Sequence, residues 1–104
     1  MATQTTEKTK LNINVGVKIK KPSMYTVVMF NDDITTMDFV IEVLVRIFHK
    51  SEKEAEEIML NIHNNGMGIA GVFTYDIAIS KKMTVDQLSQ ENGFPLKLTV
   101  DEAR

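Results

Sequence analysis

Two adjacent carboxylates and an amide follow a short β-branched and aromatic run, in the sequence Asn31-Asp32-Asp33. One acidic residue is enough to cap a helix, so the second needs a further explanation. Turn formation with capping is one interpretation. The other is a binding site for a small ammonium group, because amide and carboxylate oxygens accept hydrogen bonds and an ammonium offers three donors. The further oxygen ligands of a calcium loop are missing, so we expect no metal site.

His63 is a further residue whose side chain could serve such a site. It follows Met59 by four residues and so lies on or beside the apolar stripe of the same helix. Two interpretations of His63 are open. It could be a packed core residue, or its neutral imidazole could accept a hydrogen bond from an ammonium group. A small enzyme could use the Asp pair and His63 as acid and base. No nucleophile or phosphate loop accompanies them, so we expect a protein that is not an enzyme and has no cofactor.

Two further motifs suggest functions that their surroundings oppose. Gly66-Met-Gly68-Ile-Ala-Gly71 matches the dinucleotide pattern GxGxxG, but that mechanism needs a strand before the glycines and a helix after them. Here a helix comes first and a strand follows. The helices joined at His49-Lys50-Ser51 could suggest a DNA reader, yet the second helix carries four glutamates near its start, which oppose contact with phosphates. We expect neither a dinucleotide site nor nucleic-acid binding through this element.

The charge is divided unevenly along the 104 residues. Residues 1–22 contain five lysines and Glu7, a net charge of +4, so the remainder carries −6 of the total of −2. Apolar residues in this segment alternate with polar or small ones from Leu11 to Ile19, which also suits an edge strand. We interpret residues 1–22 as a flexible basic extension and residues 23–104 as one folded domain. Because such an extension could hold nucleic acid, a small α/β nucleic-acid or ribosome-associated domain remains the alternative function.

The apolar spacing predicts six elements in the order β-α-α-β-α-β. The strands are expected at 25–30, 69–73 and 96–100, and the helices from about 36 to 49, from 51 to 65 and from 74 to 92. The second helix is expected to begin at a capping box of Ser51 and Glu54 and to stop at Gly66. Thr84 and Gln87 offer another capping box, so the last helix is expected to be broken or kinked near Met83. The order of the six elements favours an α+β fold with a small three-stranded antiparallel sheet and the three helices packed on one face. We expect no membrane span and, because cysteine is absent, a cytoplasmic location.

Three blocks of the sequence resemble the ClpS adaptors of the ATP-dependent Clp protease. They read Tyr25-Thr-Val-Val-Met-Phe-Asn-Asp-Asp-Ile-Thr-Thr-Met-Asp-Phe-Val40, Ile58-Met-Leu-Asn-Ile-His63 and Gly71-Val-Phe-Thr74. The resemblance covers about residues 24–100. It implies an adaptor that binds the free N-terminus of N-degron substrates, whose first residue is Leu, Phe, Tyr or Trp. It also implies delivery of these substrates to the N-terminal domain of a ClpA- or ClpC-type AAA+ unfoldase.

The resemblance also implies a role for individual residues. The α-ammonium of the substrate would be bound by Asn31, Asp32, Asp33 and His63, and its side chain by Thr35, Met37, Val40, Met59, Ile62 and Leu96. Asp76 and Lys81 would contact the unfoldase. Neither nucleic acid nor a membrane is expected as a partner.

Overall fold

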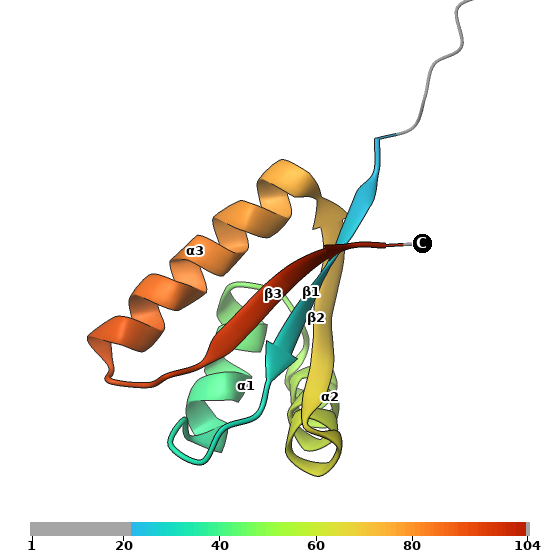
Figure 1. Cartoon of the computed structure of the whole chain (residues 1–104). Coiled ribbons are helices and arrows are strands. Elements are labelled where there is room, and N and C mark those ends of the chain that lie inside the picture. The colour runs from blue at the N-terminus through green and yellow to red at the C-terminus, as the bar shows by residue number, and fades with distance from the viewer. Residues whose placement is uncertain (1–21, 104) are drawn as a thin grey trace, which may run out of the picture.

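The computed structural model describes residues 22–103, so the expected extension lies outside the described residues except for Pro22 (Figure 1). Six elements follow one another in the predicted order. They are β1 (Met24–Phe30), α1 (Met37–Arg46), α2 (Glu52–Asn65), β2 (Met67–Thr74), α3 (Tyr75–Glu91) and β3 (Lys97–Glu102). The predicted α+β order is therefore confirmed.

The three strands form one antiparallel sheet in the order β2-β1-β3. The central strand β1 pairs with β2 from Met24 opposite Thr74 to Phe30 opposite Met67. A bulge between Val27 and Val28 shifts this register by one residue. Because side chains alternate across a strand, the register assigns each residue to one of the two faces of the sheet.

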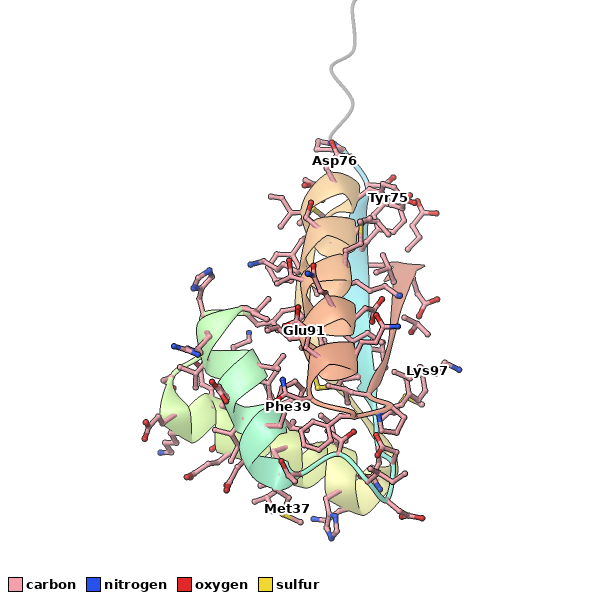
Figure 2. The ribbon with its side chains drawn as sticks, turned by 90° about the vertical axis from the view of Figure 1, so that its left-hand side faces the viewer. Met37, Phe39, Tyr75, Asp76, Glu91 and Lys97 are labelled. Carbon is pink, nitrogen blue, oxygen red and sulfur yellow. The ribbon has the colours of Figure 1, made fainter. Side chains whose placement is uncertain are left out.

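One face of the sheet carries the core. Val27 and Met29 of β1 are fully buried, and Leu98 of β3 joins them. The helix α3 lies along the strands and covers this face with Ala78 and Val85 (Figures 1 and 2). The helices α1 and α2 pack against each other and complete the same core, so the three helices lie on one face as predicted.

The first helix, α1, begins at a residue whose side chain caps it. Thr36 accepts a hydrogen bond from the backbone N–H of Phe39 at 3.2 Å. The next helix, α2, begins at the predicted capping box, in which Ser51 and Glu54 each accept a backbone hydrogen bond from the other. It ends at Gly66, which has a φ of 89°. This left-handed conformation is strained for residues with a Cβ atom and is readily adopted by glycine.

Two predicted boundaries are wrong. The first helix ends at Arg46 rather than near residue 49, because the chain turns there and His49 has a φ of 57°. The break expected near Met83 is absent, and α3 is continuous. The hydroxyl of Thr84, expected to start a second helix, donates to the carbonyl of Ser80 in the preceding turn. Within residues 22–103, no helix is long and apolar enough to cross a membrane.

Candidate functional site

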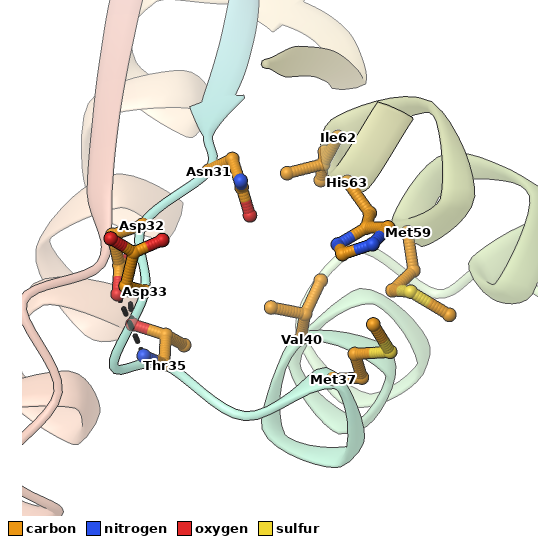
Figure 3. A pocket seen from close by; sticks show the side chains of 9 residues that line it. All are labelled: Asn31, Asp32, Asp33, Thr35, Met37, Val40, Met59, Ile62 and His63. Carbon is orange, nitrogen blue, oxygen red and sulfur yellow. Dashed lines mark hydrogen bonds between the residues drawn. The ribbon is translucent and has the colours of Figure 1, made fainter. Parts of the chain in front are cut away.

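A cavity of about 230 Å³ opens between the loop after β1, the first turns of α1 and the last turns of α2. Ligand pockets for drug-sized molecules usually hold about 300–1,000 Å³, so this one suits a single large side chain. Figure 3 shows its lining. The nine lining residues are Asn31, Asp32, Asp33, Thr35, Met37, Val40, Met59, Ile62 and His63. All nine were predicted, and they come from two segments, 31–40 and 59–63, that are separated by 18 residues of sequence.

A backbone hydrogen bond joins the two sides of the cavity. The N–H of Asn31 donates to the carbonyl of Gly66 at 2.9 Å, so the loop after β1 is held against the end of α2. Gly66 can end α2 in this geometry because it adopts the left-handed conformation. As a result, the side chain of Asn31 lies across the cavity from His63 (Figure 3).

Asp32 holds the loop in shape. One carboxylate oxygen accepts from the backbone N–H groups of Ile34 at 2.8 Å and Thr35 at 2.6 Å, and the other from the Thr35 hydroxyl at 2.7 Å. Partial burial raises the pKa of Asp32, but the hydrogen bonds from Thr35 and Ile34 outweigh it, so the pKa lies below its ordinary value of 3.8. Asp32 thus does what the turn interpretation expects of it.

The polar mouth of the cavity is formed by Asn31, Asp33 and His63. All three residues are exposed. Their side chains make no hydrogen bond with any other part of residues 22–103. An amide oxygen, a carboxylate and an imidazole nitrogen are therefore available to a ligand that donates hydrogen bonds. His63 lies on the last turn of α2 beside the apolar stripe, and it is not a packed core residue.

The apolar wall of the cavity comes from α1 and α2. Val40 and Ile62 are buried at its base, with relative exposures of 6% and 3%. Met37, which is 46% exposed, and the half-buried Met59 carry flexible thioethers nearer to solvent (Figure 3). Thioether side chains adapt to both aliphatic and aromatic groups. The wall can therefore accept more than one apolar side chain.

Three predicted residues lie away from the cavity. Leu96, expected in the wall, is packed in the core at 6% exposure, and the residues that line the cavity do not include it. Asp76 is exposed at the start of α3, and Figure 2 shows it at the far end of the molecule from Met37. Lys81, also on α3, is half-buried and donates a hydrogen bond of 2.6 Å to the carbonyl of Ile47.

The role of Lys81 as a link between elements was not predicted. Its ammonium lies over the rings of Phe48 and Phe73, at 5.9 and 5.3 Å from their centroids. It satisfies a carbonyl at the end of α1, where cations are favoured. The two partners are 34 residues apart, so no local sequence signal could reveal this contact. In residues 22–103 we find no group of three or more His, Asp or Glu side chains that could hold a metal ion.

The family model described as ATP-dependent Clp protease adaptor protein ClpS matches residues 20–99. The chain belongs to this family. It is 52% identical over 91 residues to the ATP-dependent Clp protease adapter protein ClpS of Clostridium acetobutylicum, covering 88% of this chain and 90% of the relative. It is 47% identical over 95 residues to that of Acetivibrio thermocellus, covering 91% of this chain and 96% of the relative.

A solved structure is similar in fold as well as in sequence. It is Agrobacterium tumefaciens ClpS2 bound to L-phenylalaninamide, with a TM-score of 0.76 and 35% sequence identity. The match covers 80% of this chain and all of that chain. Both the sequence and the fold therefore place the chain among the ClpS adaptors of the Clp protease.

Proposed function

We propose that this ClpS-family protein binds the free N-terminus of polypeptides that begin with Leu, Phe, Tyr or Trp. The observation that carries the proposal is one cavity in which an apolar wall meets three available hydrogen-bond acceptors. An N-terminal residue of this type presents the complementary pair, an α-ammonium next to a large apolar side chain. The Agrobacterium ClpS2 structure supports the proposal, since L-phenylalaninamide carries both groups.

The α-ammonium would lie at the mouth of the cavity. Its three donors match the acceptors of Asn31, Asp33 and His63, directly or through water. Each hydrogen bond to a charged group contributes about 1.5–3 kcal/mol. Asp32 adds negative charge while its oxygens hold the loop. In this role Asp32 supports the site electrostatically, and the neighbouring residues make the contacts.

The first side chain of the substrate would fill the cavity between α1 and α2. Burying a Leu or Phe side chain contributes about 1.5–3 kcal/mol. Together with the ammonium contacts, and after the cost of association, this supports micromolar to sub-micromolar binding. A Gly-starting peptide keeps the ammonium and loses the apolar term, so it should bind much more weakly.

We further propose that the bound substrate is delivered to the N-terminal domain of a ClpA- or ClpC-type unfoldase. Asp76 is the better placed of the two expected contacts. It is exposed and lies at the opposite end of the molecule from the cavity (Figure 2), so an unfoldase bound there would leave the cavity open. The ammonium of Lys81 is already engaged with Ile47.

The test is a fluorescence anisotropy titration with Leu-, Phe- and Gly-starting peptides that share the rest of their sequence. We expect Leu and Phe peptides to bind at least about tenfold more tightly than the Gly peptide, a difference of about 1.4 kcal/mol. Asn31→Ala should weaken the first two, while an Ile34→Ala control in the same loop should not. Equal binding of all three peptides, or cleavage of any of them by the protein alone, would contradict an adaptor role.

A further inference from the structure

The sheet has a second face that no helix of residues 22–103 covers. The β1 register places Val28 opposite Ile69 and Thr26 opposite Val72 on this face. Ile69, Val72 and Met67 have relative exposures of 57%, 46% and 51%. We call this surface, made of Thr26, Val28, Phe30, Met67, Ile69 and Val72, the open face.

A shallow groove continues the open face around the free edge of β2. It holds about 530 Å³ and runs between Val28, Met67 and Ile69 on the sheet and Ile58 and Asn65 on α2. It shares no residue with the cavity that we propose for substrates. Contiguous apolar surface of this kind on a small domain usually marks a contact site.

The segment that enters β1 has the pattern such a surface would accept. In the sequence Leu11-Asn-Ile-Asn-Val-Gly-Val-Lys-Ile19 every second residue is aliphatic without exception. In an extended chain these five aliphatic side chains point to one side. A segment with one apolar side needs an apolar surface to bury it, and residues 11–19 lie outside the described structure.

The lengths of the linker and of the segment allow residues 11–19 to reach the open face and to cover it. Four residues, 20–23, separate Ile19 from the first residue of β1, and four extended residues reach about 13 Å. Facing β layers lie about 10 Å apart, so this linker is long enough to fold the segment back onto the face. Nine extended residues span about 30 Å and the seven of β1 about 23 Å, so the segment covers the length of the face.

The charges also agree. Lys20 and Lys21 belong to this linker, and Lys18 precedes it by one residue. Asp101 and Glu102 of β3 lie opposite Thr26 and Tyr25, at the end of the sheet where β1 begins. We propose that residues 11–19 of this chain dock on the open face in an extended conformation, with their aliphatic side against Val28, Ile69 and Val72.

The absence of cysteine from the chain allows a direct test. A nitroxide spin label on Asn14→Cys lies on the polar side of the segment, and the full chain is observed by amide NMR. We expect loss of the Val28, Ile69 and Val72 signals, with those of Ser80 and Gln90 retained. A uniform effect over the domain, or no effect, would overturn the proposal.

Two matched double variants separate docking from mere proximity. Each adds two positive charges, four residues apart, to the spin-labelled chain. Ile13→Lys with Val17→Lys places them on the aliphatic side and should restore the lost signals. Asn12→Lys with Gly16→Lys places them on the polar side and should leave the loss in place. Equal behaviour of the two double variants would contradict burial of the aliphatic side.

A mixing experiment distinguishes docking of residues 11–19 within one molecule from docking of the same segment of a second copy. Isotope-labelled chain without a spin label is combined with spin-labelled chain of natural isotope abundance. Intramolecular docking predicts that the signals of Val28, Ile69 and Val72 keep their full intensity in the mixture. Loss of the same signals there would assign the occupant of the open face to another molecule and overturn the proposal.

Discussion

The carboxylate of Asp32 accepts three hydrogen bonds within its own loop, whereas Asp33 next to it accepts none from the described residues. This difference predicts different costs for the same substitution. Asp32→Asn should lower the free energy of unfolding by about 1 kcal/mol, because the neutral amide keeps one acceptor oxygen but loses the second one and the negative charge that strengthens all three hydrogen bonds. Asp33→Asn should change it by less than about 0.5 kcal/mol. Urea denaturation at pH 7 measures both, and equal losses would contradict this account of the loop.

The pH dependence of stability provides a second measurement on Asp32. Its pKa is lower in the folded chain than its ordinary 3.8, so the folded state keeps the carboxylate charged more readily than the unfolded state does. Its contribution is complete well above pH 3.8 and is lost as the pH falls below 3.8 through the lower folded-state value. The native chain should therefore lose more stability in this window than the Asp32→Asn variant does.

At the scale of elements, the start of α1 connects stability to the cavity. Thr36 caps the helix, and Met37 and Val40 in its first turn line the cavity. Thr36→Ala should cost about 0.5–2 kcal/mol of stability and should also weaken binding of a Phe-starting peptide. Thr84→Ala is the matched control because the Thr84 hydroxyl only bonds back into α3. Alanine is the better helix former there, so thermal denaturation should show no loss.

The contact between α3 and the end of α1 depends on Lys81. Lys81→Met removes the hydrogen bond to Ile47 and should cost about 1–3 kcal/mol, because a partly buried carbonyl loses its partner. Lys82→Met breaks only the partly exposed pair with Asp86, one turn along the same helix, and should cost about 0.5 kcal/mol or less. Chemical denaturation of the two variants compares them. Similar losses for both would show that Lys81 does not join the elements.

For the whole molecule, elements with strong local signals were predictable from the sequence. The capping box at Ser51 and the left-handed stop at Gly66 fix both ends of α2 within a few residues of chain, and the structure confirms both. The same local reasoning failed at Met83. Thr84 offered a capping pattern, but burial of Val85 against the sheet favours one continuous helix.

The sequence predicted which residues belong to the candidate site, but not the contacts that bring them together. Nine of the ten residues expected to bind the α-ammonium and the side chain line one cavity, because the resemblance carried them together. Leu96 is the exception, since the resemblance carried it over by position, whereas in this fold its side chain is packed in the core at 6% exposure. The hydrogen bond from Asn31 to Gly66 joins residues far apart in sequence, and only the fold brings them together.

Recognition of a free N-terminus is the central claim, and acetylation tests it most directly. Two Phe-starting peptides, identical except for an N-terminal acetyl group, are titrated against the protein by fluorescence anisotropy. The acetyl group removes the positive charge and two of the three donors and leaves the side chain intact. We predict that the acetylated peptide binds at least about tenfold more weakly, a loss of about 1.4 kcal/mol or more. Equal affinities would contradict the claim that Asn31, Asp33 and His63 bind an α-ammonium.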